Sequence, residues 1–222
     1  MNLCTAYLCI IARTSGIFIL KTGGLGTMKK IPTLFERVFE NHRKVGILPN
    51  VTIGMEWVLE GEGVATEKVD GSCCAIIDGV FYKRYDAKRG KISPAGAIPC
   101  CEPDEVTGHW PHWVKVNPED RGDIWHMVAH QNSNGDTLPD GTYEVIGPHF
   151  RNNPYSLEKD VLVKHGEKEF ADVPRSFEGI KEYLEEHYIE GIVFWKDGEP
   201  RCKIKRSDFG FEWNCGEQKG AK

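Results

Sequence analysis

The chain has 222 residues, enough for one globular domain or two small ones. Hydrophobic residues make up 40% of it and charged residues 27%, which excludes a wholly disordered, fibrous or membrane-embedded protein. The 28 basic and 33 acidic residues give a formal charge of -5. A nucleic acid would therefore have to be held by a local basic patch rather than by the overall charge.

The cysteines are not arranged like a disulfide framework. There are eight of them, and they include the adjacent pairs Cys73-Cys74 and Cys100-Cys101. This spacing is unlike that of small secreted proteins held together by disulfides. We therefore expect reduced thiols and a cytoplasmic protein.

Residues 1–27 differ from the rest of the chain. Their apolar runs, Leu3 to Ala12 and Ile17 to Leu20, are too short to cross a bilayer, which takes about 20 apolar residues. A signal peptide is the competing interpretation, but the positively charged start that such peptides need is missing. We expect a loosely ordered extension, with Met28 as the functional start, a single domain over residues 28–222 and no association with a membrane.

The first half of this domain is predicted to contain one helix followed by strands. Thr33 and Glu36 have the spacing of a capping box, so a short amphipathic helix is expected there. Asp78-Gly79 is typical of a tight hairpin turn, in which both residues need positive φ. The expected strands are Glu56 to Leu59, Val64 to Lys68, Cys73 to Ile77 and Val80 to Tyr85.

The second half alternates between helices and strands. Residues 93–118 are rich in Pro, His and Trp and are predicted to form a long ordered loop. Helices are expected from Asn117 to about His130 and from Ser176 to about Glu186. The expected strands are Thr142 to Ile146, Gly191 to Phe194 and Cys202 to Lys205. The pattern indicates one α+β domain with largely antiparallel pairing.

A lysine between two of these strands is a candidate nucleophile. Lys68 is followed by Val69-Asp70-Gly71. A lysine amine attacks only when deprotonated, so a nucleophilic lysine needs neighbours that lower its pKa from the usual ~10.4. Lys203 and Lys205, two residues apart and thus on one strand face, are such cations, and they could also bind phosphate oxygens.

Two carboxylates complete the candidate chemistry. Glu190, at the start of an apolar strand, and Glu144 could each hold Mg²⁺, directly or through water. Each feature also has an ordinary interpretation. Lys68-Val69-Asp70-Gly71 could be a β-turn, Glu190 the start of a core strand, and Lys203-Ile204-Lys205 a charged edge strand. The order and spacing of these features favour the catalytic interpretation.

These segments resemble a known family. The series Glu67-Lys68-Val69-Asp70-Gly71, Tyr143 to Gly147, Glu190 to Phe194 and Lys203 to Lys205 is similar to motifs I, III, IV and V of the covalent nucleotidyltransferases. That superfamily comprises ATP-dependent DNA and RNA ligases and messenger-RNA capping enzymes. After the motif I glycine, DNA ligases and capping enzymes usually have a different sequence, whereas Ser72 at this position is similar to the RNA ligases. Ala65 to Cys74 and Thr107 to Pro111 resemble the small RNA ligase 1 family.

The resemblance implies a three-step reaction in a single adenylation domain. Lys68 would attack the α-phosphorus of ATP, release pyrophosphate and form a lysyl-AMP. The adenylate would move to a 5′-phosphate on RNA, and a 3′-hydroxyl would then displace AMP. Mg²⁺ at Glu190 or Glu144, with Lys203 and Lys205, would stabilise charge on the phosphates.

The resemblance also assigns roles around the nucleophile. Glu67 is expected beside the adenine, Glu144 near the ribose or the metal, and Asp70 and Gly71 in the nucleotide site. The arginine of a further motif is expected to be Arg84, with Lys88 and Arg89 as alternatives. Five basic residues lie close together in the sequence here: Lys83, Arg84, Lys88, Arg89 and Lys91. They could bind along an RNA backbone, or they could be an ordinary solvated hairpin end.

Several alternatives stay open. The enzyme could be a capping-type guanylyltransferase or a minimal DNA ligase, or the chain could bind RNA without catalysis. Only 17 residues follow Lys205, so no appended OB-fold is expected, nor an obligate protein partner. A zinc site at Cys101, His109 and His112 is disfavoured by the spacing. Cys73 and Cys74 are expected to be small packed residues.

Overall fold

The computed structural model describes residues 28–41, 43–88, 90–105 and 107–214. The expected extension over residues 1–27 and the alternative Arg89 lie outside this part of the chain. Strands dominate it, and all neighbouring strands pair antiparallel. The α+β class and the largely antiparallel pairing are therefore confirmed. No helix in the described ranges is long and apolar enough to cross a membrane.

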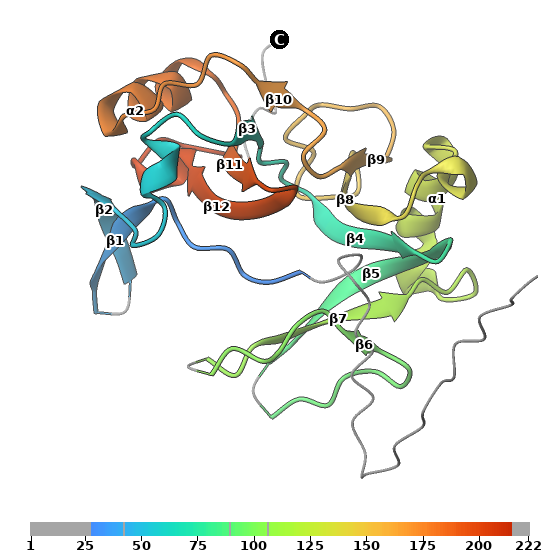
Figure 1. Ribbon diagram of the computed structural model, residues 1–222. Coiled ribbons are helices and arrows are strands. Elements are labelled where there is room, and N and C mark those ends of the chain that lie inside the picture. Colours follow the sequence, from blue (N-terminus) through green and yellow to red (C-terminus); the bar gives the residue numbers. More distant parts are fainter. Residues whose placement is uncertain (1–27, 42, 89, 106, 215–222) are drawn as a thin grey trace, which may run out of the picture.

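The first sheet contains the strand that precedes the candidate nucleophile and the strand that carries Lys203 and Lys205. Its order is β10-β3-β11-β12. The helix α2 (Phe177–Glu186) packs on one face of it (Figure 1), where Ile180 and Leu184 meet Phe194 in an apolar core. Its strands are β3 (Val64–Glu67), β10 (Glu169–Phe170), β11 (Gly191–Lys196) and β12 (Glu199–Lys205).

The second sheet has six strands in the order β6-β7-β5-β4-β8-β9. The helix α1 (Ile124–Asn132) covers one of its faces, where Ala129 packs with Phe81 and Tyr143. Its strands are β4 (Ser72–Ile77), β5 (Val80–Ala87), β6 (Ile98–Pro99), β7 (Trp110–Lys115), β8 (Gly141–Ile146) and β9 (Val161–Lys164).

The segment from β3 to β4 passes from one sheet to the other (Figure 1), so residues 68–71 lie at the junction. A glycine is required there for close packing. A Cβ on Gly71 would lie 2.3 Å from the carbonyl oxygen of Val145 in β8, far inside contact distance. The chain could not enter β4 this close to β8 at a residue with a side chain.

Several of the expected elements differ from the structure. The predicted helix at Thr33 is instead the strand β1 (Phe35–Glu40), which pairs with β2 (Arg43–Val51). Thr33 forms a parallel bridge with Lys203, and the amide of Leu34 donates to the carbonyl of Lys203. This pairing fixes the segment as extended chain before a helix could begin, and tertiary contacts of this kind override local propensity.

The predicted strand at Glu56 to Leu59 is the 3₁₀ helix η1 (Glu56–Val58). The predicted long loop over residues 93–118 contains β6 and β7; β7 pairs with β5 and β6 pairs with β7, which the Pro-rich composition concealed. The helix expected from Asn117 begins only at Ile124. The remaining expected elements are present to within a few residues. Asp78 and Gly79 have the positive φ angles that the hairpin turn was predicted to need, 51° and 71°.

Ser176 caps α2 as predicted, since its side chain accepts from the amide of Gly179. The short 3₁₀ helices η2 (Arg121–Asp123), η3 (Gly135–Thr137) and η4 (Arg206–Asp208) complete the described elements.

A stability measurement can check the packing of β11 on β12. A Cβ on Gly191 would lie 2.2 Å from the carbonyl oxygen of Ile204, a backbone atom that cannot move aside. We expect Gly191→Ala to lower the free energy of unfolding by about 1–3 kcal/mol in urea titrations. Gly46→Ala is the control, because a Cβ there has no neighbour within 4 Å. Equal effects of the two substitutions would contradict the described register.

Candidate functional site

Three lysines lie on the face of the first sheet that is turned away from α2. Lys203 is opposite Val193 and Lys205 is opposite Gly191 across the β11–β12 pair, so their side chains share that face. The amide of Lys68 donates to the carbonyl of Gly191 and continues the β3–β11 ladder by one residue. The sheet thus places Lys68 beside Lys203 and Lys205.

Glu190 joins two of these lysines. Its Oε2 lies 2.6 Å from the Lys68 amine, and its Oε1 lies 2.5 Å from the Lys205 amine. Glu190 is 5% exposed. One buried carboxylate therefore fixes the ends of two long side chains that are 137 residues apart in the sequence.

Lys203 is the third cation of this group. Burial, and then the charges of Lys68, Lys205 and Arg37, lower its pKa from the ordinary value of 10.5 to about 8; Glu190 acts in the opposite direction. The cationic cluster of Lys68, Lys203 and Lys205 thus carries more positive charge than its carboxylate neutralises. Such a cluster is suited to binding phosphate oxygens.

The Asp70-Gly71 segment is held by residues that the sequence did not indicate. The amide of Asp70 donates to the Tyr155 hydroxyl at 2.8 Å, and Trp213 Nε1 donates to Asp70 Oδ2 at 2.9 Å. Arg151 Nε donates to the carbonyl of Gly71 at 3.0 Å. Tyr155 and Arg151 lie in the segment between β8 and β9, where no spacing or motif marks them.

Glu67 lies on the other face of β3. Side chains alternate along a strand, so Glu67 points with Ala65 toward the core under α2 while Lys68 points away from it. Glu67 is 8% exposed, and its Oε2 pairs with the Lys168 amine at 2.5 Å. Its expected place beside the adenine stays a prediction.

Arg84 and Glu144 lie on the second sheet. Arg84 binds Asp86 through two hydrogen bonds of 2.8 and 3.0 Å, and its Nη1 is 3.6 Å from Met28 Sδ. Burial would lower the pKa of Arg84, but its contacts with Asp86 raise it overall. Burial would raise the pKa of Asp86, whereas Arg84, His109 and Arg151 lower it overall. Arg84 is thus a neutralised cation.

Glu144 pairs with His165, whose Nε2 is 3.2 Å from Glu144 Oε1. Cys73 is directly opposite Glu144 in the β4–β8 register, and its thiol donates to Met28 Sδ at 3.2 Å. Burial, and then the charge of Glu144, raise the pKa of the Cys73 thiol well above its usual range. In the described residues the cysteines are free thiols, as expected; Cys4, Cys9 and Cys215 lie outside them.

A hollow of about 740 Å³ lies beside His165 and the first sheet. Val64, Thr66 and Trp195 line it from the lysine-bearing face of the first sheet, and His165 lines it near Glu144. Trp195 Nε1 donates to Thr66 Oγ1 at 2.9 Å, which fixes the indole against the sheet. The hollow is bordered by both sheets and is large enough for a nucleotide-sized ligand.

Among the described residues, Cys101, His109 and His112 do not form a group whose donor atoms are close enough to share a metal ion. His112 is buried and its Nδ1 lies 2.9 Å from the carbonyl of Trp110, while His109 Nε2 lies 3.6 Å from Asp86. Within the described ranges, Cys73, Glu144 and His165 are the group of side chains whose donor atoms are close enough to hold one metal ion.

Comparison with known proteins points to the same resemblance as the sequence motifs. No model of a protein family matches the chain. It is similar to RNA ligase 1 of zebrafish, with 29% identity over 50% of this chain and 43% of the zebrafish protein. It is also similar to RNA ligase 1 of orangutan, with 23% identity over 68% of each. The chain thus spans less than half the length of the zebrafish relative, and at this low identity it resembles the RNA ligases.

The shifted pKa of Lys203 can be tested through stability. Between pH 8 and 10.5 the unfolded chain holds the Lys203 proton and the native protein does not. The contribution of this residue to the free energy of unfolding therefore rises with pH. We expect the unfolding free energy of the wild type minus that of Lys203→Met to rise by about 1–3 kcal/mol from pH 7 to 10.5. Lys115→Met, at an exposed position on β7, should give a flat difference. A flat difference for both variants would contradict a buried cation at position 203.

Proposed function

We propose that the chain is an ATP-dependent RNA ligase whose nucleotidyltransferase domain forms a covalent lysyl-AMP at Lys68. The observation that supports this most strongly is the cationic cluster around Glu190. Segments separated by more than a hundred residues supply Lys68, Lys203 and Lys205, and all three lie on the same sheet face. The similarity to proteins named RNA ligase 1 supports the same reaction.

The cluster has the chemistry that the first step needs. Lys68 supplies the amine that would form a bond to the α-phosphorus as the bond to pyrophosphate breaks. Lys203 and Lys205 would neutralise the charge that develops on the phosphate oxygens. The amine must first exchange its contact with Glu190 for the phosphorus, because the carboxylate holds it at 2.6 Å.

The nucleotide would lie between the two sheets. The hollow lined by Thr66, Trp195 and His165 is on the same face of β3 as Lys68 and offers apolar walls for a base. Glu144, the partner of His165 in this lining, would contact a ribose or a metal ion. Gly71 lets the chain after Lys68 pass close to the backbone of β8.

Mg²⁺ is the metal expected for this chemistry, and the donor set is of the right kind. Carboxylate oxygens are its preferred ligands, and Glu190 and Glu144 would supply them. Glu144 Oε2 has no hydrogen-bond partner among the described residues, whereas both oxygens of Glu190 are paired with lysines, and Glu190 would have to release one of these lysines. When bound, Mg²⁺ would neutralise phosphate charge.

The substrate is proposed to be RNA with a 5′-phosphate and a 3′-hydroxyl. Exposed cations near the site could hold its backbone. Arg151, whose side chain is 64% exposed, lies beside Asp70 and Gly71 at the end of the nucleophile segment. Such contacts would be sensitive to salt and insensitive to sequence.

Intact-protein mass spectrometry after incubation with ATP and Mg²⁺ tests the covalent step. We expect the wild-type chain to gain the mass of one AMP and Lys68→Arg to gain none, because arginine keeps the charge but is not a nucleophile at neutral pH. Lys115→Arg is the matched control and should react like the wild type. AMP attached to Lys68→Arg would show that another residue is the nucleophile, and no adduct in the wild type would contradict the enzyme proposal.

A second experiment identifies the type of transferase. With labelled ATP and GTP in parallel, we expect label from ATP alone to remain on the protein in a denaturing gel. Joining is then compared on nicked RNA and nicked DNA duplexes, and we expect sealing of RNA at least ~10-fold faster. Label from GTP would indicate a capping-type guanylyltransferase, and preferential sealing of DNA would indicate a DNA ligase.

A further inference from the structure

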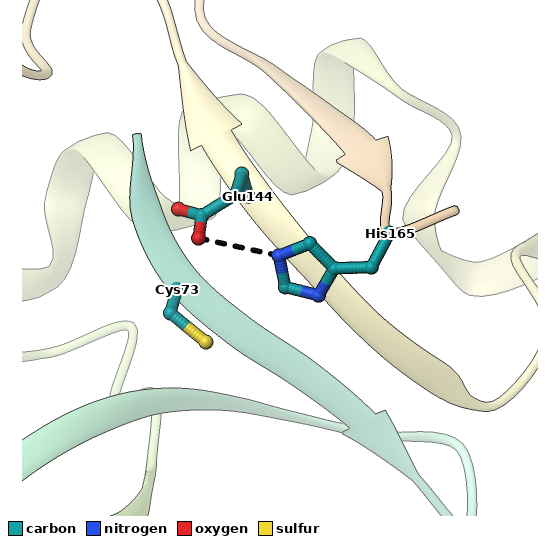
Figure 2. A group of neighbouring side chains, drawn as sticks. All are labelled: Cys73, Glu144 and His165. Atoms are coloured by element: carbon teal, nitrogen blue, oxygen red, sulfur yellow. Dashed lines mark hydrogen bonds and ion pairs between the residues drawn. The ribbon is translucent and has the colours of Figure 1, made fainter. Parts of the chain in front are cut away.

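Three different metal-ligating side chains converge on one face of the second sheet (Figure 2). Cys73 comes from β4, Glu144 from β8, and His165 follows directly after β9. One donor atom of each lies within 4.8 Å of those of the other two. A thiolate, a carboxylate and an imidazole are the three types of ligand that zinc accepts in proteins.

Strand pairing holds the three residues in place. Cys73 and Glu144 are direct partners in the β4–β8 register, so their side chains share a face. β9 pairs with β8, and the amide of His165 donates to the carbonyl of Thr142 at 3.1 Å. The group is therefore built on rigid elements of the sheet rather than on a surface loop.

The environment of His165 suits a metal ligand. Its Nδ1 lies 2.8 Å from Thr142 Oγ1, on the side of the ring away from Glu144. When Nδ1–H donates to this hydroxyl, Nε2 keeps its lone pair and directs it toward Glu144 and Cys73. Metal-bound histidines commonly have such an outer hydrogen bond, which fixes the tautomer and the ring orientation.

Glu144 has a buried oxygen that the described part of the protein leaves unsatisfied. Oε1 contacts His165, but Oε2 is buried and has no hydrogen-bond partner among the described residues. A buried carboxylate oxygen without a partner is costly unless a cation or a donor reaches it. Arg84, the nearby cation, is already bound to Asp86 through two hydrogen bonds.

We propose that Cys73, Glu144 and His165 form a binding site for one zinc ion. Coordination would replace the proton of the Cys73 thiol, which is released to solvent, and the thiolate and carboxylate would balance the charge of the dication. His165 lines the hollow between the sheets, which gives an ion a route to the site. Three protein ligands leave a fourth position open, as in zinc sites that bind a further ligand.

Cobalt binding, measured without nucleotide or Mg²⁺, tests the site separately from the ligase proposal. Co²⁺ replaces zinc and shows a thiolate charge-transfer band when a cysteine is bound to it. We expect this band to saturate at one equivalent of Co²⁺ and to disappear when Zn²⁺ is added. Cys73→Ser should lose the band, and Cys101→Ser, at the other partly exposed thiol of the described residues, should keep it.

Thr142→Val is the variant that tests the positioning of His165. It removes the hydroxyl at Nδ1 but no ligand, and we expect the affinity for Co²⁺ to fall about 10–100-fold. A band of wild-type strength in Cys73→Ser, or no band in the wild-type protein, would overturn the proposal.

Alkylation of the wild-type protein keeps the proposal testable if the variants fail to fold. Iodoacetamide labelling is followed by peptide mass spectrometry with and without one equivalent of Zn²⁺. We expect Zn²⁺ to slow labelling of Cys73 at least ~10-fold and to leave Cys101 unchanged, since a metal-bound thiolate is shielded from the reagent. Equal rates at Cys73 with and without Zn²⁺ would contradict the site.

Discussion

The buried carboxylate of Glu190 is the contact on which the candidate active site depends. It binds the amines of Lys68 and Lys205, which come from opposite halves of the chain, at 2.6 and 2.5 Å. A buried carboxylate with no partner would be unstable, and so would clustered lysines with no counter-charge. Each side of this ion-pair group requires the other, and together they hold three cations where a phosphate could bind.

The surrounding fold reinforces this arrangement. Asp208, 2% exposed, accepts from Arg37 on β1 at 3.1 Å, from Lys44 on β2 and from the amide of Lys205 at 2.9 Å. This buried carboxylate ties the β1–β2 hairpin to the end of β12. Arg37 in turn adds to the positive charge that lowers the pKa of Lys203. The hairpin thus contributes to the electrostatics of a site that it does not line.

Much of this site could be predicted from the sequence because its residues lie at strand ends. Alternation along β12 places Lys203 and Lys205 on one face, and the antiparallel pairing of β3, β11 and β12 brings residue 68 to them. The hairpin at Asp78-Gly79 was equally predictable, since few residues other than glycine and asparagine or aspartate adopt positive φ.

Other features depend on contacts that no local pattern encodes. The capping-box sequence at Thr33 predicted a helix, but pairing with Lys203, 170 residues away, makes the segment extended. Tyr155, Arg151 and Trp213 hold Asp70 and Gly71 from irregular stretches without a periodic signal. His165 could have been found only by knowing that β9 pairs with β8 and so places it beside Glu144.

A crystal structure with an ATP analogue that cannot release pyrophosphate would test the central claim most directly. The decisive quantity is the distance from Lys68 Nζ to the α-phosphorus. We expect the amine to have left Glu190 and to face this phosphorus at about 3–3.5 Å, the separation of a near-attack geometry, with Lys203 and Lys205 on phosphate oxygens. An analogue bound elsewhere, with Lys68 still paired to Glu190, would contradict the account.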